Sequence, residues 1–432
     1  QCSQIHSMIV DVFEKQSGGS SLGYGREGRR FSGGGGPSSG GGGGGGAGGP
    51  LKADAHRLLA RHCSLAEKWD SAFQQYMEAG RKAEQTYNFS EAAKMYEEAI
   101  VCQGNMNPSP MRLRSRLLPT LKLGNCLREL ARYHEAEAVL SRCLNEAELE
   151  LSVGNGDEEM HVRALAALAT LHQYQSKYDA ARRLYERAVP LAREIETEGS
   201  SLWLAGNVAG YAEILRKSGN LRKAEGLHRE ALEIRNRAAE EGSCTDLELA
   251  VSYTQLGCTL SGLRRFEEAY KQHRLALQSR IKHLDFSHGL VSESLNYCAE
   301  TLNAMDRGGD GVPLAIHAVE IRKVVFGSSH PALAHAQSVL AACFHSVGRT
   351  HDAKELLEQC LRICEAAFPK NHANLIPNLM NYGRVLRSLK NFREARDIYE
   401  RAIVVHQLNF NENQKAGQLD KCRTEVYELT RE

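Results

Sequence analysis

Small residues recur along this chain at fixed distances, and this pattern constrains the fold more than any other feature of the sequence. In nine registers a small reference residue is followed by Ala or Cys seven positions later and preceded by Ala or Gly twelve positions earlier. Residues at i and i+7 lie two turns apart on one helix face, so the pattern predicts closely packed helices. The nine reference residues are Ala72, Ala92, Ala136, Ala181, Ala224, Ala269, Gly311, Ala353 and Ala395.

The distances between reference residues predict a stack of helix pairs. From Ala92 onward the steps are 42 to 45 residues, a period typical of arrays in which each pair contacts only its neighbours. The first step, from Ala72 to Ala92, is 20 residues and leaves room for single helices only. We therefore expect three consecutive helices within residues 51–105, seven helix pairs within 110–410, and a capping helix within 415–431.

The N-terminal region differs from this array. Residues 1–16 carry apolar side chains at helical spacing, which we interpret as a short amphipathic helix, the tail of an upstream module. Residues 17–50 are so rich in glycine that we predict a disordered linker. The string "GYGREG" within it has no predicted strand before it and no helix after it, so we do not interpret it as a dinucleotide site.

The triad of small residues resembles that of the tetratricopeptide repeat. Residues 314–364, with the turn "FGSSHP" at 326–331, look like the kinesin-light-chain type of this repeat. The resemblance implies an all-α fold, a right-handed α-solenoid. His288, His330 and His372 recur in the turn at steps of 42 residues, and we expect them to cap helices. One register departs from the others, because "MDRGGDGVPLAIHA" at 305–318 predicts a shortened or frayed second helix.

A second resemblance covers residues 51–105. This segment, from "AHRLLARHCSLAEKW" to "AAKMYEEAI", looks like the helical region that follows the ATPase module of adenylate-cyclase-type signalling NTPases. The resemblance implies that a nucleotide-binding module would precede Gln1.

Composition narrows the range of functions. Lys and Arg number 54 against 53 Asp and Glu, a balance that gives no net field to attract nucleic acid or a membrane surface. The 12 cysteines include no CxxC pair, and we interpret them as small buried side chains in a reducing, cytoplasmic compartment, with no metal. We found no catalytic or nucleotide-binding motif in the array, so we expect no cofactor and no enzymatic activity.

A partner-binding groove is expected on the concave side, along the first helix of each pair. Exposed positions there lie eight, eleven and fourteen to fifteen residues before the reference residue, and we name the first two minus-eight and minus-eleven. Arginines there suit carboxylates, and asparagines suit a peptide backbone, although solvated helix faces carry the same residues. The candidate residues are Arg128, Arg216, Asn296, Asn303, Asn381, Arg384 and Arg387.

Three functions fit these observations. We favour a non-catalytic scaffold that binds a partner protein or peptide on the concave surface. The alternatives are a regulatory or sensor arm of a larger signalling ATPase or nucleotide cyclase, and a cargo adaptor of the kinesin-light-chain kind. The oligomeric state and the partner's identity do not follow from the fold.

Overall fold

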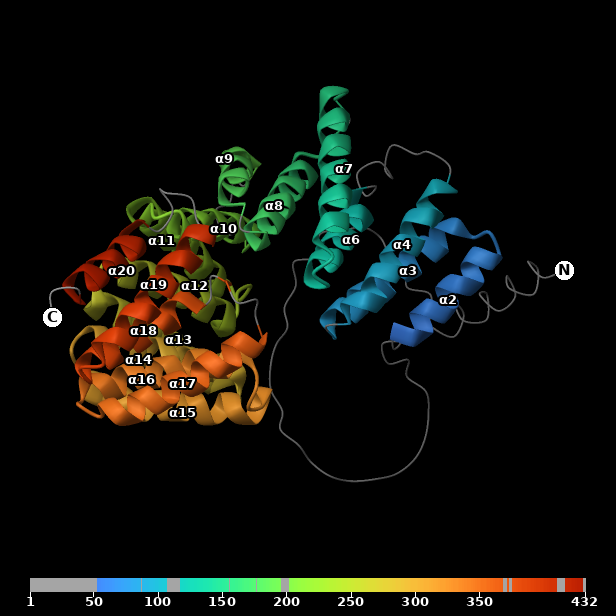
Figure 1. Cartoon of the computed structure of the whole chain (residues 1–432). Coiled ribbons are helices and arrows are strands. Elements are labelled where there is room, and N and C mark those ends of the chain that lie inside the picture. The colour runs from blue at the N-terminus through green and yellow to red at the C-terminus, as the bar shows by residue number, and fades with distance from the viewer. Residues whose placement is uncertain are drawn as a thin grey trace, which may run out of the picture. The chain divides into compact units, whose positions relative to one another are not determined.

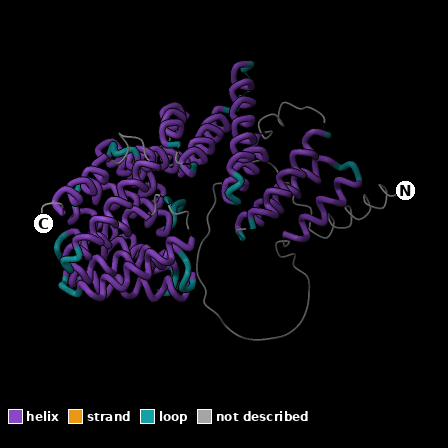
Figure 2. The backbone as a smooth tube through the Cα atoms, in the orientation of Figure 1, coloured by secondary structure: helices purple, strands orange, loops and turns teal. Residues whose placement is uncertain are grey.

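The computed structural model describes residues 53–86, 88–106, 117–154, 156–175, 177–195, 202–367, 371–372, 375–409 and 416–429. The described residues form α-helices joined by short turns, and no strand occurs among them (Figure 2). The predicted helix in 1–16 and the predicted linker in 17–50 lie outside this range. None of the helices in the described part combines the length and the apolar character needed to cross a membrane. The chain divides into two units, residues 1–197 and 198–432.

Unit 1 begins with three consecutive helices and continues with two helix pairs, each helix packing on the next (Figure 1). The three helices are α2 (Ala53–Leu65), α3 (Trp69–Gln85) and α4 (Phe89–Gly104), and the pairs are α6 (Leu117–Glu129) with α7 (Tyr133–Ser152) and α8 (Glu158–Tyr174) with α9 (Tyr178–Ile195).

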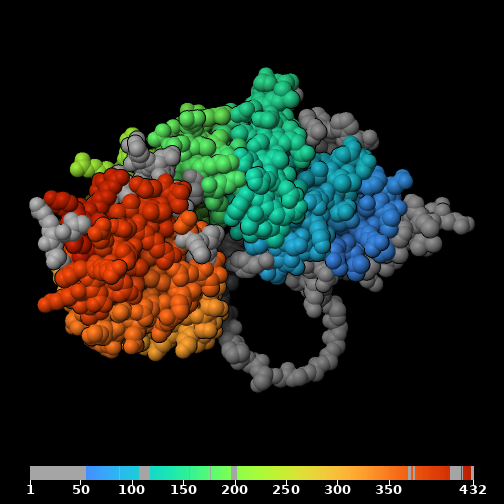
Figure 3. Space-filling model, in the orientation of Figure 1, coloured from blue at the N-terminus to red at the C-terminus, as the bar shows by residue number. Residues whose placement is uncertain are grey.

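Unit 2 is a longer stack of pairs in which consecutive helices again pack together, followed by one further helix. In Figure 1, α14, α16 and α18 lie side by side, and in Figure 3 the orange and red part that contains them presents a closed surface of packed side chains. The pairs are α10 (Leu202–Lys217) with α11 (Leu221–Glu240), α12 (Asp246–Gly262) with α13 (Phe266–His283), α14 (Gly289–Ala304) with α15 (Gly308–Phe326), α16 (Pro331–Ser346) with α17 (Thr350–Ala367), and α18 (Ile376–Ser388) with α19 (Phe392–Asn409); α20 (Ala416–Leu429) packs on α19.

The small residues of the repeat lie where the helices approach most closely. Every member of the nine triads is buried, which confirms the interpretation of the pattern. A Cβ atom on Gly124 would lie 2.4 Å from Leu140 Cδ2, and one on Gly383 would lie 2.7 Å from the Tyr399 ring. A larger side chain at either position would therefore separate two helices of a pair.

A left-handed residue turns the chain between the two helices of a pair. The backbone φ is positive five residues before the reference residue in every register whose turn is described at that position. Glycine adopts this conformation at low cost, whereas other L-residues are strained by it. The residues are Glu67, Ala131, Gly219, Arg264, Asp306, Gly348 and Lys390, with φ between 58° and 85°.

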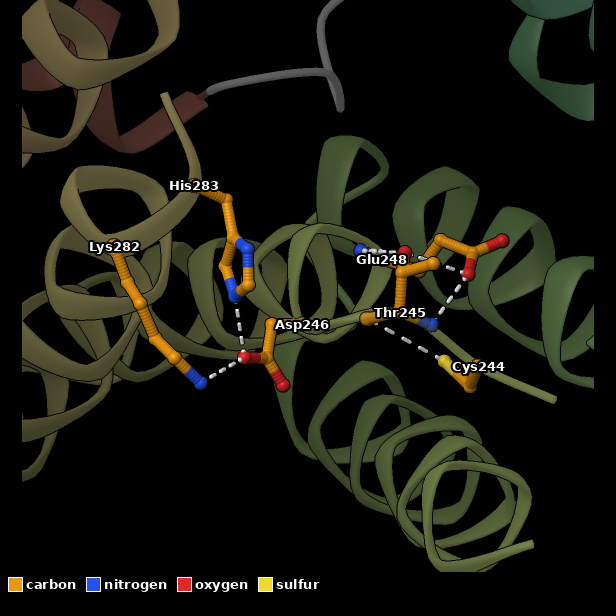
Figure 4. Close-up of polar contacts among 6 residues, drawn as sticks. All are labelled: Cys244, Thr245, Asp246, Glu248, Lys282 and His283. Atoms are coloured by element: carbon orange, nitrogen blue, oxygen red, sulfur yellow. Dashed lines mark hydrogen bonds and ion pairs between the residues drawn. The ribbon is translucent and has the colours of Figure 1, made fainter. Parts of the chain in front are cut away.

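Side-chain caps fix where several helices begin. Thr245 and Glu248 form a reciprocal capping box at the start of α12, in which the Glu248 N–H donates to Thr245 Oγ1 and the Thr245 N–H donates to the Glu248 carboxylate (Figure 4). Beside it, Asp246 Oδ2 accepts hydrogen bonds from Lys282 Nζ (2.8 Å) and His283 Nε2 (2.6 Å) at the end of α13. These bonds hold the pKa of Asp246 below its ordinary value and join the two ends of the pair.

Two of the three histidines of the repeated turn, His288 and His330, also cap helices, as predicted, and the cap by His372 stays a prediction. The N–H of Leu290 donates to His288 Nδ1 at the start of α14, and the N–H of Ala332 donates to His330 Nδ1 at the start of α16, both at 3.1 Å.

The predicted shortening of the helix after residue 305 is wrong. α15 runs for 19 residues from Gly308 to Phe326, with Pro313 inside it. Its glycines are required by close packing, because a Cβ atom on Gly308 would lie 1.9 Å from Ser346 Oγ and one on Gly311 3.0 Å from the Ala299 carbonyl oxygen. Tertiary contacts with α14 and α16 outweigh the low helix propensity of glycine here.

Candidate partner-binding surface

The first helices of the pairs form the inner side of each unit. In unit 2, α10, α12, α14 and α16 each contact the first helix of the next pair, whereas the second helices of successive pairs contact one another less in the described residues. A stack whose first helices lie closer together curves toward them, so their free faces line a concave wall. We call this face in unit 2 the inner wall.

Two of the predicted arginines are bound to acceptors on their own helix. Arg128, in unit 1, donates to Asn125 Oδ1 (3.1 Å) and Glu129 Oε1 (2.7 Å). Arg216, in unit 2, donates two hydrogen bonds to the carboxylate of Glu213, at 2.7 and 2.8 Å. Both guanidinium groups are therefore already bound within the chain. The sequence pattern predicts them instead as groups that bind the carboxylates of a ligand.

The two arginines of α18 differ from each other. Arg387 donates to Glu425 Oε2 (2.9 Å) and Glu428 Oε2 (2.8 Å), so α20 already supplies its carboxylates. Arg384 is exposed and donates to Asn381 Oδ1 at 2.7 Å, and within the described part of the chain it makes no ion pair. Of the four predicted arginines, Arg384 alone has no acidic partner in that part.

The predicted asparagines are more buried than expected for ligand-holding residues. Asn296 is 1% exposed, its Nδ2 lies 2.9 Å from His335 Nδ1, and its Oδ1 has no hydrogen-bond partner. Asn303 is half-buried, and its Oδ1 also has no partner. Asn381 donates to Ser338 Oγ at 3.0 Å. The structure brings Asn381 and Arg384 together, and places Asn296 and Asn303 on one face of α14, seven residues apart.

Sequence reasoning did not single out Glu300, which lies at the minus-eleven position of α14. It is exposed, and among the described residues its carboxylate has no hydrogen bond or ion pair. Protein nevertheless surrounds it closely enough that burial raises its pKa. The sequence shows that Glu300 lies at the minus-eleven position, but it does not show that no oppositely charged side chain among the described residues pairs with it.

Tyr297 and Cys258 contribute the apolar surroundings of this carboxylate. The Tyr297 ring stacks on that of His273 with centroids 5.1 Å apart, and burial raises the pKa of the Cys258 thiol to about 12. Both side chains are neutral at pH 7, so they contribute no positive charge to the wall near Glu300. In the described residues we find no group of three metal-ligating side chains.

Arginines on the second helices, of which Arg280 and Arg322 are buried and Arg235 is half-buried, are another feature that the sequence reasoning missed. Arg280 donates to the Leu290 carbonyl (2.9 Å) and Ser294 Oγ (2.8 Å) of the next helix, and Arg322 donates to the Ala332 carbonyl (2.7 Å). Arg235 donates to Ser252 Oγ. All three lie eleven residues after the reference residue. The sequence shows this periodic position, but it does not show how far the side chains are buried.

Comparison with known proteins agrees with this architecture. Residues 116–194 and 290–366 match one family model described as tetratricopeptide repeat, and residues 249–288 and 379–413 match another with the same description. These segments make up more than half of the sequence, and the chain belongs to the tetratricopeptide-repeat family. A search of curated proteins found no match.

Solved structures similar to this chain include a Rap protein, a signal transduction ATPase and a putative kinesin light chain. A Rap protein complexed with competence and sporulation factor is 12% identical, with 83% of this chain and 98% of that chain covered and a TM-score of 0.53. A signal transduction ATPase with a tetratricopeptide repeat sensor, from Pyrococcus horikoshii, is 16% identical, with 71% and 44% covered and a TM-score of 0.52. A putative kinesin light chain repeat structure from Podosopora anserina is 20% identical, with 47% and 94% covered and a TM-score of 0.40. At these identities the likeness concerns the fold alone.

Proposed function

We propose that this chain is a non-catalytic interaction module that binds a partner peptide or protein along the inner wall of unit 2. The observation that carries the proposal is the pair Glu300 and Arg384. Both are exposed on first helices of the same unit, they have opposite charges, and within the described residues neither has an ionic partner. An interface that matches both would gain charge complementarity on each side.

The spacing of these two residues suits an extended chain. Glu300 lies on α14 and Arg384 on α18, with α16 packed between them. Packed helices lie about 8–10 Å apart, so roughly 20 Å separates the two first helices. An extended peptide covers that distance with about six residues. The likeness to a Rap protein solved in complex with a second molecule is in keeping with binding by such a stack.

Selection from a random library of twelve-residue peptides displayed on phage tests the proposal with the full chain. We expect peptides to be enriched, and hydrogen exchange of the chain with a selected peptide to slow on α14, α16 and α18 more than on α15, α17 and α19. Failure to enrich any peptide, or protection confined to the second helices, would contradict the proposal.

A second candidate is a sensor arm of a larger signalling ATPase. It is supported by the likeness to the Pyrococcus horikoshii protein, whose name includes a tetratricopeptide repeat sensor. The gene sequence upstream of Gln1 tests it, since this candidate requires a nucleotide-binding P-loop there.

A further inference from the structure

Two glutamates occupy the same register of the inner wall but have different surroundings. Glu213 of α10 and Glu300 of α14 both lie at the minus-eleven position. Three residues after Glu213 stands Arg216, whose guanidinium donates two hydrogen bonds to that carboxylate. Three residues after Glu300 stands Asn303, which carries no charge. The inner wall therefore has a glutamate at the minus-eleven position of two helices, and only one of these glutamates is paired with an arginine.

Two side-chain oxygens near Glu300 on α14 have no hydrogen-bond partner among the described residues. Asn303 Oδ1 is buried and has no hydrogen-bond partner, and the same holds for Asn296 Oδ1 four residues before Glu300. The three residues fall at i, i+4 and i+7 and so lie on one helix face. Glu300 is the exposed residue of the three, and its unpaired carboxylate favours a ligand that brings N–H donors and a positive charge.

The pKa values of the two glutamates differ accordingly. Burial alone would raise the pKa of Glu213, but the hydrogen bonds and charge of Arg216 outweigh it and hold that pKa below its ordinary value. Burial raises the pKa of Glu300, because no cation is there to offset it. A cation placed beside Glu300 would thus restore the balance that Arg216 gives to Glu213.

We propose that Glu300 receives an arginine side chain of the partner, held as Arg216 is held by Glu213. This assignment rests on the proposed function of the inner wall. Arginine fits better than lysine, because its planar guanidinium binds a carboxylate with two parallel hydrogen bonds, as Arg216 binds Glu213.

Peptides selected on the full chain test the assignment. We expect one position to be fixed as arginine, and Glu300→Gln to weaken binding by about ten- to hundredfold, the loss of one charged hydrogen-bond pair. Asn303→Arg should weaken it similarly, because an arginine on the same helix would occupy Glu300 as Arg216 occupies Glu213.

Val324→Arg is the matched control. It places the same side chain on the second helix α15, at a position that is 81% exposed and outside the inner wall, and binding should change little. Glu300→Arg should bind a selected peptide in which the fixed arginine is replaced by glutamate better than it binds the original. Helical circular dichroism and thermal unfolding of each variant show whether the fold is kept.

The outcomes separate the two proposals. Selected peptides that carry no fixed arginine, or that bind Glu300→Gln as well as the unchanged chain, overturn the arginine assignment and leave peptide binding in place. If no peptide is enriched on any of the variants, peptide binding by the inner wall fails, and the arginine assignment fails with it.

Discussion

Units 1 and 2 share one backbone pattern but differ in what fills the gap between neighbouring pairs. Eleven residues after the reference residue, three of the four registers of unit 1 have a buried alanine, Ala83, Ala147 or Ala192, and the fourth has Gln103. At the same position the first three pairs of unit 2 have Arg235, Arg280 and Arg322, which reach the start of a first helix, whereas the last two pairs have Cys364 and His406. The partner position in unit 1 is apolar as well, since Ala164 stands where unit 2 has Ser252 or Ser294.

The difference shows that the small-residue triad sets how close the helices come but leaves the chemistry of the next contact open. An apolar contact such as that of Ala147 tolerates small shifts along the helices. A buried arginine that must meet a carbonyl and a hydroxyl fixes the register of the two helices instead. Such fixed registers hold α12, α14 and α16 of the inner wall, and Glu300 lies on α14.

The two tryptophans of the chain allow this comparison to be measured in the full-length protein. Trp69 lies in α3 of unit 1 and Trp203 in α10 of unit 2, and the sequence contains no other tryptophan. In a Trp203→Phe background the fluorescence reports unit 1, and in a Trp69→Phe background it reports unit 2.

Acidification should separate the units most. Burial lowers the pKa of His228 and His273, both almost fully buried in unit 2, from the usual 6.5 to about 4, so the unfolded chain binds protons that the folded unit does not. The stability that these two histidines contribute is therefore complete above pH 6.5 and falls as the pH drops toward 4, by on the order of 2–3 kcal/mol per histidine. The raised pKa of Glu300 acts in the opposite direction.

Urea unfolding at pH 7.0 and 4.5 with the two reporters measures this effect. The midpoint of unit 2 should fall further than that of unit 1, in which burial lowers the pKa of His161. His273→Gln should reduce the pH dependence of unit 2. Equal shifts of the two unfolding midpoints would contradict the expected difference between the units in their response to pH.

Placing a unit 2 residue into unit 1 should have the next largest effect. Ala147→Arg buries a guanidinium opposite Ala164, where no hydroxyl can accept from it, and overfills a packed contact. We expect a loss of about 3–5 kcal/mol in unit 1. Ala138→Arg, on the exposed face of the same helix, is the control and should change the unfolding free energy by less than about 0.5 kcal/mol. Similar losses for both variants would contradict the assignment of the interior.

The reverse change should cost somewhat less. Arg280→Ala leaves the Leu290 carbonyl and Ser294 hydroxyl without their donor and Glu293 without its ion pair at 3.0 Å. We expect a loss of about 2–4 kcal/mol seen by Trp203, and faster hydrogen exchange at the start of α14. The exposed Arg274 on the same helix provides the control, because Arg274→Ala should leave both signals unchanged.

The smallest expected effect concerns the turn residues with positive φ, which both units contain. Ala131 in unit 1 and Lys390 in unit 2 both have a positive φ, near 58° and 61°. Replacing either by glycine should stabilise its unit by about 0.5–1 kcal/mol, because the strain relieved exceeds the added entropy of the unfolded chain. Gly219→Ala should destabilise unit 2 by a similar amount, since a Cβ atom there meets no neighbour and only the backbone resists. Gains confined to one unit would show that the turns are not equivalent.

The sequence by itself determined the helical stack, because a triad of small residues at fixed spacing permits close packing in one arrangement only, as Gly124 against Leu140 illustrates. It also determined the capping histidines, since a cap depends on neighbours within a few residues. The prediction for α15 was wrong because it relied on the low helix propensity of glycine. Contacts with α14 and α16 maintain a helix that begins with glycines.

Only the tertiary structure decided which groove residues are available to a partner. The sequence places Arg216, Arg384 and Arg387 at similar positions, but Arg387 is bound by Glu425 and Glu428 of α20, nearly forty residues away in the chain. Glu300 stands out for the converse reason, the lack of any cation near it in the described residues. The charge state and availability of a side chain depend on which groups from distant segments come within a few ångströms, and spacing along one helix does not contain that information.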